Sequence, residues 1–167
     1  MDYLFRKGLK NSFLYCIEME IFKNWIQPQT YSKIGFEDVK YAIKYPETHI
    51  LINTLSLGSQ QNLIKNTIPA EKEEFTINHI IEDYKMNDMK ILIYGRNATD
   101  ESIEKKAKQI ISLGFVQVFL YYGGLFEWFL LQEIYGFNEF PTTYYSKTVD
   151  LLKYKPEKRF DLLRLEY

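Results

Sequence analysis

Apolar and polar positions fall in blocks along the chain, and the lengths of the blocks predict strands and helices in turn. Short apolar runs bounded by Gly, Pro or polar residues are typical of strands buried in a parallel sheet. They are residues 49–55, 91–94 and 116–121. Longer stretches carry apolar residues at helical spacing. They are residues 32–45, 71–84, 101–113 and 124–136. This order predicts an α/β protein.

The stretch 91–115 gives the most regular of these signals: a buried strand, a short polar loop and a helix. Thr99 or Asp100 can cap the helix, because either side chain can accept a hydrogen bond from a free backbone N–H group. Gly114 stands where a left-handed residue commonly ends a helix. A strand, a tight loop and a helix N-terminus can together bind an anion. The simpler interpretation is a strand-end turn at Gly95 followed by a capped helix.

The helix predicted at 124–136 is apolar on almost every side, so it must be covered on almost every side. The cover can come from the N-terminal residues, from the C-terminal tail or from a second subunit. An apolar surface beyond what one domain covers marks an interface. The candidate interface residues are Leu125, Phe126, Trp128, Phe129 and Ile134.

Composition excludes several classes of function. The chain has 167 residues, 46% of them hydrophobic, which is enough for one domain with its own core. A net charge of -1 argues against nucleic-acid binding. Cys16 is the only cysteine and His79 has no second His or Cys nearby, so we expect no disulfide, metal or cofactor. No apolar run reaches the length of a membrane span. These features suit a cytoplasmic protein.

Three regions are expected along the chain. Residues 1–30 predict an N-terminal helical extension that docks on the domain, with a membrane-surface helix as the alternative. Residues 31–141 form the domain, and residues 142–167 form a C-terminal tail packed on it. A signal peptide is not expected, because the apolar run at 13–17 is short and Glu18 and Glu20 follow it.

Residues 91–128 resemble the second half of a rhodanese domain. The resemblance rests on the strand ending at Tyr94, the helix ending in Gly114-Phe115, the next strand, and the run from Gly123-Gly124 to Trp128. It implies a three-layer α/β/α fold with a central, mostly parallel sheet of about five strands. It also implies that the loop at the carboxyl edge of the sheet is the ligand site. That loop consists of Gly95, Arg96, Asn97, Ala98, Thr99, Asp100, Glu101 and Ser102.

The sequence departs from the family at the positions that carry its chemistry. Gly95 stands where the family has its catalytic cysteine, and Asp100 and Glu101 stand where a cation tends to fall. A thiolate held by backbone N–H groups is the basis of the family's reaction. We therefore predict no catalytic residue, and a protein-binding or self-associating module. The alternative is a binder of a small anion or other ligand, or an enzyme, with a rebuilt loop related to those of sulfurtransferases and phosphatases.

The loop, the run Gly123–Trp128 and the segment 140–143 also resemble uncharacterised rhodanese-like proteins of large DNA viruses. That resemblance implies a viral protein of the host cytoplasm or of the virion. A third interpretation is therefore a structural protein of a virion or complex.

Overall fold

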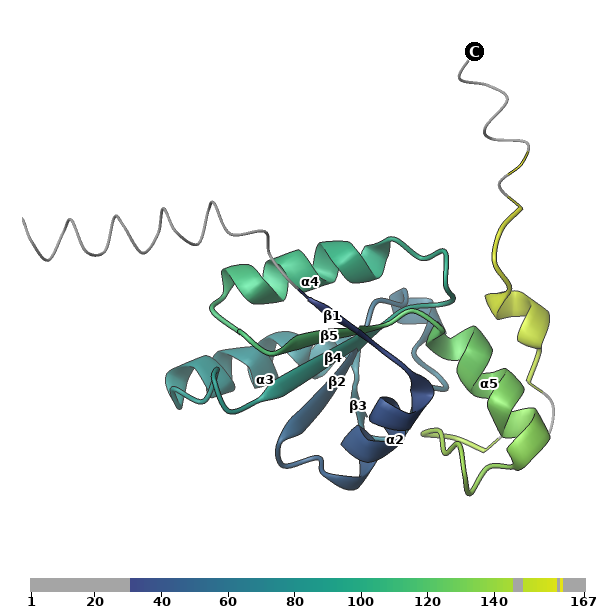
Figure 1. Ribbon diagram of the computed structural model, residues 1–167, viewed down its shortest axis with the longest axis horizontal. Coiled ribbons are helices and arrows are strands. Elements are labelled where there is room, and N and C mark those ends of the chain that lie inside the picture. The colour runs from purple at the N-terminus through teal and green to yellow at the C-terminus, as the bar shows by residue number, and fades with distance from the viewer. Residues whose placement is uncertain (1–30, 146–148, 159, 161–167) are drawn as a thin grey trace, which may run out of the picture. The chain divides into compact units, whose positions relative to one another are not determined.

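A computed structural model describes residues 31–145, 149–158 and 160 of the chain (Figure 1). The chain divides into two units, Met1–Thr30 and Tyr31–Tyr167. The predicted N-terminal extension, with Cys16, lies outside the described residues. No helix in the described part of the chain is long and apolar enough to cross a membrane.

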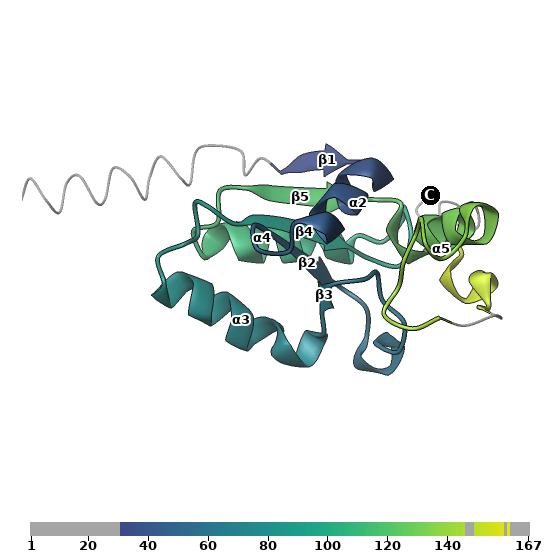
Figure 2. The same cartoon turned by 90° about the horizontal axis from the view of Figure 1, so that it is seen from below.

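The second unit is built on a five-stranded sheet in which every strand pairing is parallel. Figure 2 shows the strands side by side in the order β1-β5-β4-β2-β3. The strands are β1 (Ser32–Ile34), β2 (His49–Asn53), β3 (Thr67–Ile68), β4 (Lys90–Tyr94) and β5 (Val118–Tyr121). The predicted α/β fold with a parallel sheet of about five strands is confirmed.

Helices cover both faces of this sheet and make three layers (Figure 1). α2 (Phe36–Lys44) and α5 (Gly124–Tyr135) pack on one face, and α3 (Ala70–Glu82) and α4 (Ser102–Ser112) pack on the other. Two 3-10 turns complete the described elements, η1 (Leu57–Ser59) and η2 (Leu151–Tyr154). A strand buried on both faces must be apolar at every position, which explains the continuous apolar runs in the sequence.

The side chains of β4 show this division. Ile91 and Ile93 join the core beneath α3 and α4, while Leu92 and Tyr94 join the core beneath α2 and α5. Successive side chains of a strand point to opposite faces, so one strand contributes to both cores. Each core is a separate apolar cluster, and β4 lies between its neighbours β5 and β2.

The prediction of a helix over residues 32–45 was wrong at its start. Ser32–Ile34 is the edge strand β1, paired with β5 in the register Ser32↔Phe119, and the helix begins at Phe36. Gly35 separates the two elements, and its N–H donates to the Asp38 side chain at 3.1 Å. A strand of three residues is held by its distant partner, so local spacing does not reveal it.

The strand order fixes where ligand loops lie. From β2 the chain continues to β3 on one side, whereas from β4 it continues to β5 on the other side. In open parallel sheets, ligands bind at the carboxyl ends of the strands where the order reverses in this way. Here that point lies between the ends of β2 and β4, where the loop beginning at Gly95 leaves the sheet.

Candidate functional site

The loop 95–101 is fixed against the first turn of α5. The Leu125 N–H donates to the Gly95 carbonyl at 3.1 Å, and the Phe126 N–H donates to the Arg96 carbonyl at 3.0 Å. Gly124 has φ +60°, and a Cβ there would lie 2.7 Å from the Gly95 carbonyl oxygen. Only glycine permits so close an approach of two backbones. Gly124 therefore allows α5 to pack directly on the loop.

The carboxylate of Asp100 occupies the centre of the loop. The Arg96 N–H donates to Asp100 Oδ2 at 2.9 Å, and the N–H and hydroxyl of Ser102 donate to Asp100 Oδ1 at 3.0 and 2.5 Å. A Cβ added at Gly95 would lie 2.9 Å from Asp100 Cγ and from Ile103 Cγ2, which is too close for carbon atoms. The donors that could hold an anion at a helix N-terminus thus hold an acid of the chain itself.

Hydrogen bonds also cross the crevice between the ends of β2 and β4. Ser102 Oγ and Thr54 Oγ1 lie 2.7 Å apart, within hydrogen-bonding distance, and the Thr54 N–H donates to the Tyr94 carbonyl at 3.0 Å. Thr54 follows β2, so these bonds connect the two strands at the point where their loops diverge. The sequence gives no signal for Thr54, because its partner lies 48 residues away.

A C-terminal segment lies over the loop. Asn97 is only 4% exposed, and its side-chain N–H groups donate to the carbonyls of Tyr154 and Lys155 at 2.8 and 3.1 Å. Its amide oxygen accepts from the N–H and hydroxyl of Thr99 at 3.0 and 2.9 Å. The Tyr154 ring packs on Phe129 with centroids 5.3 Å apart, and burial raises the pKa of the Tyr154 hydroxyl. Asn97 therefore connects the loop to η2.

The eight loop residues fall into two groups. Asn97, Thr99, Asp100 and Ser102 lie in one hydrogen-bond network with the backbone of Arg96, and Gly95 is buried beside Asp100. Ala98, Glu101 and the Arg96 side chain lie at the surface. Of the two predicted helix caps, Asp100 accepts the bond from the first helical amide. Among the described residues, no three His, Cys, Asp or Glu side chains gather as a metal site requires.

The candidate interface residues of α5 are mostly covered by the chain itself. Leu125, Trp128 and Phe129 are buried, whereas Phe126 is half-buried and Ile134 is 69% exposed. The cover on this helix includes C-terminal residues of the described part. Trp128 packs on Phe140 and donates from Nε1 to a backbone carbonyl at 3.2 Å, and Phe129 packs on η2. Three of the five residues thus lie inside the domain.

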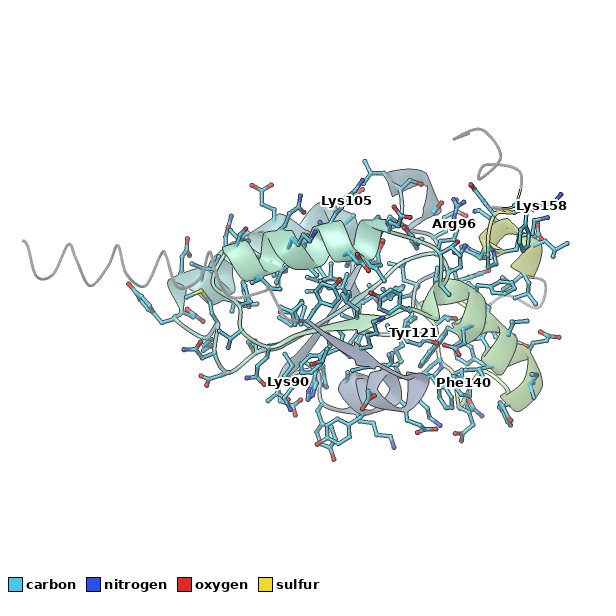
Figure 3. The ribbon with its side chains drawn as sticks, turned by 45° about the horizontal axis from the view of Figure 1, so that its top comes forward. Lys90, Arg96, Lys105, Tyr121, Phe140 and Lys158 are labelled. Atoms are coloured by element: carbon cyan, nitrogen blue, oxygen red, sulfur yellow. The ribbon has the colours of Figure 1, made fainter. Side chains whose placement is uncertain are left out.

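Tyr121 at the end of β5 completes the site's surroundings. Its hydroxyl is buried without a hydrogen bond to any residue in the described ranges, and its ring packs edge-on against Trp128. Burial raises the pKa of this hydroxyl, and the Glu127 carboxylate adds to the effect. Figure 3 shows Tyr121 near the same end of the sheet as Arg96. The end of β5 therefore has an acidic side chain beside it, Glu127, just as the Gly95 loop has Asp100.

Comparisons with known proteins give matches to solved structures alone. No family model matches the sequence, and no curated protein matches it. The BH2092 protein of Bacillus halodurans is 20% identical, with a TM-score of 0.49 over 71% of this chain and 83% of that protein. A full-length protein from Lactobacillus plantarum is 17% identical, with a TM-score of 0.43 over 71% and 94%. A single-domain sulfurtransferase of Saccharomyces cerevisiae is 14% identical, with a TM-score of 0.42 over 60% and 90%. Likeness at these identities concerns the fold alone.

Proposed function

We propose that the chain is a non-catalytic, rhodanese-like protein that acts as a protein-binding or self-associating module. One observation carries the non-catalytic part: the Asp100 carboxylate fills the space into which a side chain at Gly95 would project. A sulfurtransferase needs a thiolate there, with free N–H donors around it. In this loop the nucleophile is missing and the donors of Arg96 and Ser102 are engaged.

The alternative, a binder of small anions, requires Asp100 to leave the loop. An anion about 4 Å from this carboxylate would be repelled by about 4 kcal/mol at an effective dielectric constant near 20. Arg96 is exposed and can offset part of that repulsion. If Asp100 instead leaves the loop, the repulsion is relieved but the three hydrogen bonds to its carboxylate are lost. A protein-binding role is therefore the better-supported function.

The binding part of the proposal rests on the outer side of α5. Phe126, Leu130 and Ile134 follow one another at intervals of four residues along one stripe of the helix. Leu130 is 38% exposed and Ile134 is 69% exposed. Leu152 of η2, which packs against α5, is 68% exposed. We call these four residues the α5 surface. Leu130, Ile134 and Leu152 are its exposed members, and exposed apolar side chains that gather in this way mark a partner site.

The test is the mass of the full-length protein in solution across a range of concentrations, measured by sedimentation velocity. Self-association is expected, and Ile134→Glu should weaken it by placing a charge in the α5 surface. Phe75→Glu is the matched control, because Phe75 is an equally exposed side chain on α3. A monomer at every concentration, with no partner on co-purification, would argue strongly against the proposal.

The remaining parts of the proposal come from the sequence. The viral origin, the location in the cytoplasm of a host cell and the structural role in a virion stay predictions. Absence of the protein from purified particles would remove the structural role. Nucleic-acid binding is not expected, because the net charge is -1.

A further inference from the structure

A groove lies on the α2 face of the sheet, towards the amino ends of the strands. On this face α5 packs over the carboxyl ends of β4 and β5, where Trp128 contacts Tyr121, and α2 packs beside β2. Beside α2 a hollow of about 410 Å³ remains, with a floor of Ile34, Leu92 and Phe119. Leu92 and Phe119 are paired in register on neighbouring strands, so they form one continuous apolar floor. We call this hollow the α2 groove.

Two basic side chains stand together at one end of the α2 groove. His49 and Lys90 are register partners on β2 and β4, so their side chains lie on the same face of the sheet. His49 Nδ1 lies 2.8 Å from Thr48 Oγ1 and 3.2 Å from the Tyr45 carbonyl oxygen. Its Nε2 bonds to no residue in the described ranges, and Lys90 forms no ion pair within them. Both groups can therefore serve a ligand.

An aromatic wall and one acidic group complete the rim. Tyr41 is 54% exposed, and its ring lies edge-on to His49 with centroids 5.5 Å apart and 4.5 Å from the Tyr45 ring. Asp38 also borders the groove, but its Oδ2 accepts the Gly35 N–H at 3.1 Å. The groove thus combines an apolar floor, a flat aromatic side and a pair of basic groups.

Pockets of about 300–1,000 Å³ with mainly apolar walls and a few placed polar groups are typical small-molecule sites. We propose that the α2 groove binds a small planar aromatic molecule that carries one carboxylate. Its ring would lie on Leu92 and Phe119 beside Tyr41, and its carboxylate would meet Lys90 and His49. Asp38 would repel a second anionic group, so the site selects monoanions. This inference is independent of the α5 surface and of the Gly95 loop.

The test is a titration of the full-length protein with indole-3-acetate at constant ionic strength, followed by backbone amide NMR. Indole-3-acetamide serves as the uncharged isostere, and acetate tests whether the carboxylate alone is enough. Lys90→Gln removes the ammonium group from a half-buried side chain and should leave the fold intact. Lys105→Gln is the control, because Lys105 is exposed on α4 on the other side of the sheet (Figure 3).

The expected result is saturable shifts at residues 38–41, 49, 90 and 119 with indole-3-acetate. Lys90→Gln and the change to the acetamide should each weaken binding about tenfold, the effect of one charge-assisted hydrogen bond worth about 1.4 kcal/mol. Lys105→Gln should bind as the wild type does. Three results would overturn the proposal. The first is no saturable shift up to about 5 mM, a concentration that would largely fill a site with a Kd of about 1 mM. The others are equal affinity for the acetamide and equal losses in the two lysine variants.

Discussion

Replacing Asp100 with alanine should both destabilise the fold and open the loop to anions. The variant loses the acceptor for the Arg96 N–H and for the N–H and hydroxyl of Ser102. Loss of a capping side chain costs about 0.5–2 kcal/mol, and a hydrogen bond to a charged group contributes about 1.5–3 kcal/mol. Water can replace the hydrogen bond at the exposed Arg96, and Ser102 keeps its hydrogen bond to Thr54. We therefore expect the free energy of unfolding to fall by about 2–3 kcal/mol.

Urea denaturation measures that loss of stability. Added sulfate then tests separately whether Asp100 keeps anions out of the loop. In Asp100→Ala the two freed N–H groups can hold sulfate, so sulfate at ten times its Kd should restore about 1.4 kcal/mol. The wild type should gain only the general stabilisation that sulfate gives a folded protein, because Asp100 occupies the donors. Asp88→Ala is the matched control, since Asp88 is an exposed carboxylate elsewhere on the domain.

Backbone amide NMR gives the result that would refute this reasoning. The Arg96 and Ser102 amide signals should move in Asp100→Ala and move again, saturably, when sulfate is added. A loss of less than about 0.5 kcal/mol, the range of ordinary surface substitutions, with both signals unmoved would show that Asp100 does not fill the loop. Sulfate binding by the wild type at these amides would instead favour the anion-binding function.

Three further predictions concern the interior. Tyr94→Phe should lower the free energy of unfolding by about 1–3 kcal/mol, because the Tyr94 hydroxyl bonds to a backbone N–H and a threonine. Tyr121→Phe should lower it by less than about 0.5 kcal/mol, since the Tyr121 hydroxyl has no such bond in the described part. Urea midpoints test both variants. Gly124→Ala should lower the free energy of unfolding by more than about 1–2 kcal/mol, because Gly124 has a positive φ and lies close to the Gly95 carbonyl. Gly58→Ala is the control, because a Cβ added at Gly58 meets nothing within 4 Å. Burial raises the pKa of Tyr94 and Tyr121 above that of unfolded tyrosine, about 10. The unfolded chain therefore loses protons first, so stability should fall as pH rises above about 10, and urea midpoints that stay flat to pH about 11 would contradict this.

The sequence by itself determined the elements with strong local signals. Continuous apolar runs bounded by turn residues placed β2, β4 and β5, and helical spacing placed α3, α4 and α5. Gly114, with φ +100°, ends α4 as predicted. These signals are readable because burial on both faces of a strand, or on one face of a helix, constrains neighbouring residues of the chain.

Only the tertiary structure decided how the candidate site is filled. The sequence identified Asp100 as an acid in the loop, but not that its carboxylate takes the place of a side chain at Gly95. It also did not predict that β1 is a strand, that Thr54 meets Ser102, or that Asn97 binds η2, 57 residues further on. Each of these depends on a partner brought near by the fold of the sheet, and such contacts leave no periodic pattern in the local sequence.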